Sequence, residues 1–199
     1  MSFPTFYLFT YFYYTIISRL STHAWEQREL GSIAQIVDTK HATAPITDEK
    51  TNYLMIRTST VRNGALFPNL MDHVTQLTYM KWSERIVLQP EDVVFTREAP
   101  MGESAVIPDD SNNYFLGQRV VAIRPTKELN ANYLVANFLA PSFKKKITVR
   151  NSESTTVANF GIGSLNKHLI DLPTNEEQNQ IGNFFKQLDD TIALHQRKV

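Results

Sequence analysis

Cations, amides and hydroxyls stand where several predicted strands end, and together they are suited to contacting nucleic acid. The strand-end candidates are Arg57, Thr58, Thr96, Arg97, Gln118 and Arg119. A denser basic run follows later in the chain, made of Lys144, Lys145, Lys146 and Arg150, and then the hydroxyls of Ser154, Thr155 and Thr156. Lysine and arginine neutralise phosphates, whereas arginine, glutamine and asparagine can pair with base edges. Each residue alone is typical of a solvated loop, so it is their joint placement that favours a DNA-binding face.

Two roles are expected within this set. The four cations of the basic run should mainly hold phosphates, which is contact without sequence information. Arg97 and Gln118 lie at strand ends and carry a guanidinium and a side-chain amide, respectively. They are therefore the candidates for hydrogen bonding to base edges. Two structural alternatives stay open, with Arg97 as the ion-pair partner of a nearby acid and Gln118 as a group that satisfies a strand end.

Sequence motifs for catalysis are missing. The chain contains no phosphate-binding G-x-x-x-x-G-K-[ST], no G-x-S-x-G, and no Asp-Pro-Pro-Tyr or Asn-Pro-Pro-Tyr segment typical of adenine methyltransferases. The 5 histidines are scattered without ligand spacing, so neither a metal site nor a general base is expected. We therefore expect a non-catalytic protein that needs no cofactor of its own.

The composition is that of a globular protein without disulfides. Of 199 residues, 42% are hydrophobic and 20% charged, and 20 Lys+Arg balance 20 Asp+Glu. A net charge of zero argues against a non-specific nucleic-acid coat but permits a basic face. Cysteine is absent, which excludes zinc ribbons and thiol catalysis and fits a reducing cytoplasm as the expected location.

The elements that would position these residues form one α/β (α+β) domain over residues 25–173, with a mixed, largely antiparallel sheet and flanking helices. The chain before it, residues 1–24, is an atypical aromatic leader that is too short for a membrane span. Apolar spacing predicts helices over 26–37 and 130–140, and strands at 93–96, 103–108 and 117–125. Asn63-Gly64 predicts a hairpin turn, and residues 144–160 are expected to form a basic loop.

The last helix, predicted over residues 174–199, has a capping box at Thr174 and Glu177 and then an apolar repeat. The repeating residues follow at steps of four and three: Ile181, Phe185, Leu188, Ile192 and His195. This heptad pattern favours packing against a second long helix. We therefore expect an antiparallel homodimer joined helix to helix, with a helix lying across its own domain as the alternative.

The chain resembles the specificity subunit of type I restriction–modification systems. "WEQRELGSIAQIV" is similar to the opening of a target recognition domain in that family, and "DVVFTREAPMGESAVIPDD" and "LGQRVVAIRP" resemble its central strands. "LPTNEEQNQIGNFFKQLDDTIALHQRK" resembles the start of its spacer helix. The resemblance covers residues 25–199, and nothing is carried over to the leader.

The resemblance implies a division of labour among subunits. A full specificity subunit has two target recognition domains, each for half of a bipartite DNA site, and two antiparallel helices that dock methyltransferase subunits. Those subunits methylate adenine with S-adenosylmethionine, and a restriction subunit can join them. This chain would be half of such a subunit, and a homodimer would recognise an inverted repeat with a spacer. Two other classes stay open, a stand-alone dimeric DNA-binding regulator and a cryptic enzyme.

Overall fold

The computed structural model describes residues 25–153 and 159–196, so the leader and the predicted contacts Ser154, Thr155 and Thr156 lie outside the described residues. The strands are β1 (Glu26–Glu29), β2 (Ala34–Asp38), β3 (Tyr53–Ile56), β4 (Val61–Arg62), β5 (Ala65–Leu66), β6 (Asp72–His73), β7 (Val93–Thr96), β8 (Ser104–Val106), β9 (Asn113–Leu116), β10 (Val120–Pro125) and β11 (Leu169–Leu172). The α-helices are α2 (Leu30–Ile33), α3 (Gln76–Trp82), α4 (Ala131–Leu139), α5 (Pro141–Glu153), α6 (Ile162–Asn166) and α7 (Asn175–Gln196). Within the described residues, no helix is long and apolar enough to cross a bilayer.

The central sheet has four strands in the order β2-β10-β7-β8, all antiparallel. The predicted strands β7, β8 and β10 are confirmed, and the α+β fold class with them. Val121 pairs with Asp38, and Val120 pairs with Thr96. The end of β2, the end of β7 and the start of β10 therefore meet at one end of the sheet.

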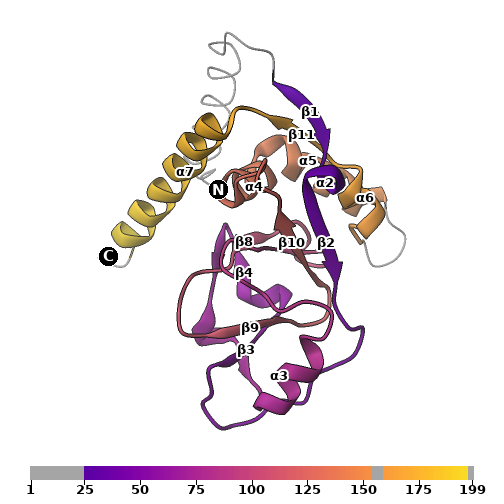
Figure 1. Ribbon diagram of the computed structural model, residues 1–199, viewed down its shortest axis with the longest axis vertical. Helices are drawn as coiled ribbons and strands as arrows, with labels where there is room; N and C mark the ends of the chain where they lie inside the picture. Colours follow the sequence, from indigo (N-terminus) through magenta and orange to yellow (C-terminus); the bar gives the residue numbers. More distant parts are fainter. Residues whose placement is uncertain (1–24, 154–158, 197–199) are drawn as a thin grey trace.

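A second sheet, β6-β3-β9, forms the lower part of the molecule with α3 (Figure 1). Strands β3 and β9 are parallel, with Ile56 opposite Leu116. Three residues, Gly117 to Arg119, then lead directly into β10 of the central sheet. This short connection brings the ends of β3 and β9 to the same end of the central sheet as Asp38 and Thr96.

The hairpin predicted at Asn63-Gly64 is present but short. Strands β4 and β5 pair over two residues each, and the φ angles of Asn63 and Gly64 are 47° and 83°, which suit a tight hairpin turn. Strand β3, which precedes this hairpin in the chain, pairs with β6 and β9 instead.

The predicted helix over 26–37 is wrong. The segment forms β1, one helical turn and β2, because both flanks have strand partners far away in sequence. Strand β1 pairs with β11, and β2 pairs with β10. Leu30 and Ile33 are fully buried between them, so the helical spacing of apolar residues reflects one turn rather than a long helix.

The predicted loop over 144–160 is also wrong in its first half. Pro141 ends α4 as expected but is the first residue of α5, a position where its missing N–H costs nothing. Phe143 and Ile147 are both buried, 2% and 5% exposed, and lie one turn apart. They attach α5 to the core, and Lys145 and Lys146, which lie between them in sequence, are exposed on the outer face.

Candidate nucleic-acid interface

The predicted strand-end residues lie together in space. The Arg97 amide donates to the Arg119 carbonyl at 2.8 Å, and the Gly117 amide donates to the Ile56 carbonyl at 2.8 Å, next to Arg57. The Phe160 amide donates to the Arg97 carbonyl at 2.8 Å. We call this region the strand-end face. It comprises Asp38, His41, Arg57, Arg97, Glu98, Gln118, Arg119 and Asn159, together with the outer side of α5.

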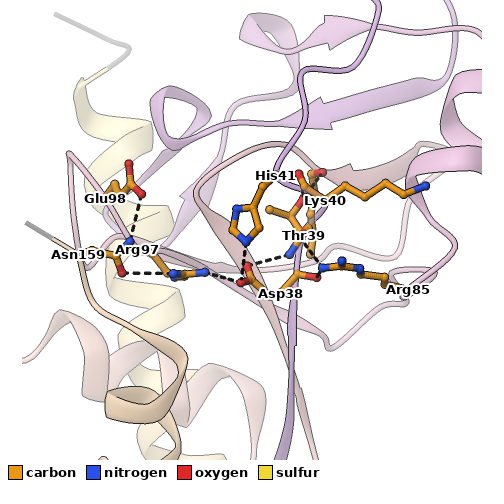
Figure 2. A network of polar contacts seen from close by, with 9 residues as sticks. Asp38, Thr39, Lys40, His41, Arg85, Arg97, Glu98 and Asn159 are labelled. Atoms are coloured by element: carbon orange, nitrogen blue, oxygen red, sulfur yellow. Dashed lines mark hydrogen bonds and ion pairs between the residues drawn. The ribbon is translucent and has the colours of Figure 1, made fainter. Parts of the chain in front are cut away.

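Arg97 is held inside this face rather than presented on it. Its side chain is 13% exposed, and Nη1 donates to Asp38 Oδ2 at 2.6 Å. Nη2 donates to Asn159 Oδ1 at 3.3 Å, and Figure 2 shows the guanidinium between the two partners. The geometry supports the structural alternative for Arg97, because its terminal nitrogens are already used.

Thr96 is fully buried and has no surface for DNA. Its hydroxyl donates to the Pro100 carbonyl at 2.5 Å and accepts from the Glu103 amide at 3.0 Å. These bonds close the loop from β7 to β8. The prediction that Thr96 contacts DNA is corrected, because its hydroxyl hydrogen bonds are made within the loop.

The basic run separates into inward and outward members. Lys144 is 19% exposed, and its ammonium donates to Glu103 Oε1 at 2.8 Å and to the Gly102 carbonyl at 2.9 Å. Lys144 therefore ties α5 to the β7–β8 loop, and its contact with a phosphate stays a prediction. Lys145 and Lys146 are exposed on the outer side of α5 and remain candidates for phosphate contact.

Arg150 is exposed but oriented by its neighbours. Its Nε donates to the Asn159 carbonyl at 2.9 Å, and its guanidinium lies 5.2 Å from the centre of the Phe160 ring. The hydrogen bond to Asn159 and the contact with the Phe160 ring both hold the side chain near the strand-end face. Arg150 therefore remains a candidate for contact with a phosphate.

The other predicted contacts differ in how far they are exposed. Arg57 is 44% exposed and pairs with Asp72 at 2.9 Å, whereas Arg119 is 60% exposed and pairs with Glu98 at 2.9 Å. Thr58 and Gln118 are half-buried. Arg119 is therefore more exposed than Arg57.

Sequence reasoning missed the acids and the imidazole of this face. Asp38 accepts from Arg97, and His41 Nε2 lies 3.3 Å from the same carboxylate oxygen (Figure 2). Glu98 accepts from Asn159 Nδ2 at 3.0 Å. The only signal was the adjacent Arg97-Glu98 pair, because the other partners come from distant parts of the chain.

Comparison with known proteins decides the family. The model of the type I restriction modification DNA specificity domain matches residues 23–199. The chain belongs to this family. No curated protein matches the sequence.

Three solved structures share the fold of this specificity domain. One, described as a structural basis for assembly and conformational transition of the type I R-M system, has 18% identity and a TM-score of 0.63 over 92% of this chain and 45% of its own. The HsdS subunit from Thermoanaerobacter tengcongensis has 17% identity and a TM-score of 0.62, over 96% of this chain and 46% of its own. The type I S subunit from M. genitalium has 12% identity and a TM-score of 0.57, over 95% and 45%. The specificity domain thus spans about half the length of the structures it matches.

Helix α7 of the specificity domain begins with the predicted capping box. The Thr174 amide donates to Glu177 Oε2 at 3.0 Å, and the Glu177 amide donates to Thr174 Oγ1 at 3.3 Å. A third contact, from the Asn130 amide to Gln178 Oε1 at 2.9 Å, ties the first turn to the start of α4. The helix therefore begins where the sequence predicts and is fixed to its own domain.

The apolar heptad repeat predicted for α7, which we call the seam, lies in two different environments. Ile181 and Phe185 are 2% and 4% exposed and belong to the domain's own core, so their assignment to a partner helix is corrected. The physical reason is that the first turns of α7 lie along α4, as Figure 1 shows. Leu188 is half-buried, while the side chains of Ile192 and His195 lie outside what the structure describes. Their contact with a partner stays a prediction.

Proposed function

We propose that this chain binds a defined DNA sequence through the strand-end face and presents that site to methyltransferase subunits, which methylate adenine there. The observation that carries the proposal is the arrangement of charge on this face. Asp38, Glu98 and Glu103 each lie against a cation that the fold supplies. Lys145 and Lys146 remain exposed on the outer side of α5, so the described part of this face offers cations to DNA while these three acids are already paired.

The scaffold behind the face also suits specific recognition. Sequence is recognised by side chains held in fixed positions against base edges, whereas phosphate contacts set register and orientation. Partly buried hydrogen bonds from Thr96 and Lys144 fix the β7–β8 loop. The ion pair of Arg97 fixes the end of β7. Membership of the DNA specificity domain family supports the same role.

The partners belong to this proposal as well. Two copies would join through the distal part of α7, including Leu188, Ile192 and His195, and this helix pair would dock two methyltransferase subunits. S-adenosylmethionine would bind those subunits rather than this chain. A restriction subunit would join through the same complex. The match to about half of each solved specificity subunit supports a role as one of two equivalent halves.

Reconstitution tests the proposed function. The purified chain is incubated with its cognate modification subunit, plasmid DNA and labelled S-adenosylmethionine. We expect methyl transfer to adenine only when both proteins are present. Sequence-specific DNA binding without any methyl transfer would instead favour the stand-alone regulator, and methyl transfer by the chain alone would favour the cryptic enzyme.

A further inference from the structure

Arg119 combines exposure with an unusual backbone conformation. Its φ is 68°, in the left-handed region that non-glycine residues adopt at a cost. The strain is local to the connection from β9 to β10, between Gly117 and Val120. Its side chain is 60% exposed, so the strained backbone places a guanidinium on the surface rather than in the core.

The guanidinium of Arg119 is oriented from one side. Nε pairs with Glu98 Oε2 at 2.9 Å. No other hydrogen bond or ion pair of this side chain is found within the described part of the chain. The ion pair at Nε holds the group from one side and leaves the two terminal nitrogens as a free donor fork.

Glu98 is itself held by a series of contacts that begins at the half-buried Asp38, which we call the polar relay. Its members are Asp38, Arg97, Asn159 and Glu98. Arg97 donates to Asp38 and to Asn159, and Asn159 Nδ2 donates to Glu98 Oε1 at 3.0 Å. The two oxygens of Glu98 therefore serve different partners, one inside the relay and one on Arg119. Figure 2 shows the four side chains of the relay in order, joined by dashed lines from Asp38 through Arg97 and Asn159 to Glu98.

The backbone reinforces this arrangement. The Arg97 amide donates to the Arg119 carbonyl, and the Phe160 amide donates to the Arg97 carbonyl, both at 2.8 Å. Three chain segments are thus joined at one point, and the side chains of the relay have little freedom to rearrange. A donor fork held in this way loses less side-chain entropy on binding than a mobile arginine.

We propose that Arg119 recognises a guanine through its two terminal nitrogens and that the polar relay positions it, an assignment that rests on the proposed function. Guanine presents two acceptors, O6 and N7, in the major groove, and a free arginine fork pairs with both. Arg97 does not have this capacity, because Asp38 and Asn159 occupy its terminal nitrogens.

A lysine substitution separates recognition of a base from binding of a phosphate. The complex with the methyltransferase subunit selects sequences from a random double-stranded DNA library. Arg119→Lys keeps the positive charge but loses the two-pronged geometry. We expect the preference for guanine at one position of each half-site to fall roughly 10-fold to 100-fold. The salt dependence of binding to random DNA should be unchanged, because the charge is retained.

The relay is tested by variants that keep the charge of the face. Arg97→Lys retains a cation beside Asp38 but cannot reach Asn159 with a second nitrogen, and Asn159→Ala removes the link to Glu98. Both should weaken the preference at the same position as Arg119→Lys and leave other positions unchanged. A merely structural role would instead lower binding at every position, and a thermal melt of each variant reports whether it is folded. Lys127→Gln, an exposed change on the far side of β10, is the control and should select the wild-type sequence.

The outcomes distinguish the two proposals. If Arg119→Lys selects the same sequence with the same preference as the wild type, the assignment of Arg119 is overturned while the proposed function stands. If the relay variants change no single position, the positioning role is overturned. If the wild-type complex enriches no sequence at all, the proposed function fails and the assignment fails with it.

Discussion

At the scale of single residues, pairing decides which cations of the strand-end face are available to DNA. Arg97 and Lys144 are the most enclosed, 13% and 19% exposed, and each donates to a carboxylate and to a second group. Arg119 is 60% exposed with one carboxylate. Residue type predicted all three as DNA contacts, because the sequence does not show which acids the fold brings beside them.

Lys145 and Lys146 provide the first prediction at this scale. Replacing both with glutamine should weaken binding to cognate and random DNA alike, because phosphate contacts carry no sequence information. The slope of log affinity against log salt should fall by about one unit for each lost contact. Titrations at two salt concentrations measure it, with Lys127→Gln as the control. Unchanged affinity on both DNAs would place the DNA-binding face elsewhere on the domain.

His168 provides the second prediction at this scale, which concerns how the stability of the domain depends on pH. Burial lowers the pKa of His168 to about 4, with Lys146 contributing and Asp171 opposing. Its ring lies against Phe138 and Phe143, with centroid distances of 6.0 Å and 4.9 Å. The native state thus keeps the ring neutral, whereas the unfolded chain takes up a proton near the ordinary value of 6.5.

The sign follows from proton linkage. The contribution of His168 to the free energy of unfolding is fully present above pH 6.5. It falls as the pH drops from 6.5 to about 4 and then stays constant. The slope is about 1.4 kcal/mol per pH unit, for a total of up to about 3 kcal/mol. Denaturant unfolding of wild type and His168→Phe across this range measures it, and the variant should lose most of the slope. Equal slopes would show that other groups cause the pH dependence.

At the scale of elements, long-range pairing explains what could and could not be predicted. Strands β7 and β10 were predictable, because buried strands carry continuous apolar runs between turn residues. The capping box of α7 was predictable because it is local. Strand β2 was not, since its conformation depends on pairing with β10 far along the chain. Helix α5 was missed because only Phe143 and Ile147 mark its buried side, among charged neighbours.

The close approach of α7 to α4 gives a prediction at Gly182. A Cβ atom there would lie 2.9 Å from both the backbone nitrogen of Tyr133 and the Cβ of Asn132. Gly182→Ala should therefore destabilise the domain by about 1–2 kcal/mol, because overpacking exceeds the gain in helix propensity. Gly163→Ala in α6 meets nothing within 4 Å and should be neutral or stabilising. A comparison of the melting curves of the two variants checks this. Equal melting temperatures would show that α7 can move away from α4 without loss of stability, which would contradict the prediction.

The divided seam changes how the predicted dimer must be tested. Phe185→Asp would place a charge in the core, so loss of dimers in that variant would report unfolding. Leu188→Asp with Ile192→Asp should instead give folded monomers, if the distal part of α7 holds the partner helix. Sedimentation measures the mass and a melting curve verifies folding. A folded double variant with the dimer mass would exclude this surface.

At the scale of the whole molecule, the symmetry of the proposed homodimer would link the fold to the DNA site. Two copies related by a two-fold axis would place the same strand-end face on each half-site in opposite orientation. The distance between the two faces would be set by the helix pair, so the half-sites would be separated by a fixed spacer. This geometry is a property of the assembly and follows from no single residue.

The methylated sites in living cells test the central claim most directly. Cells that carry this chain and its methyltransferase subunit are sequenced by a method that detects N6-methyladenine, beside cells that carry the methyltransferase alone. We predict methylation at one inverted repeat with a fixed spacer, present only when the chain is present. An identical methylation pattern without the chain would contradict its role in choosing the site, and an asymmetric bipartite site would show that a different second half takes part.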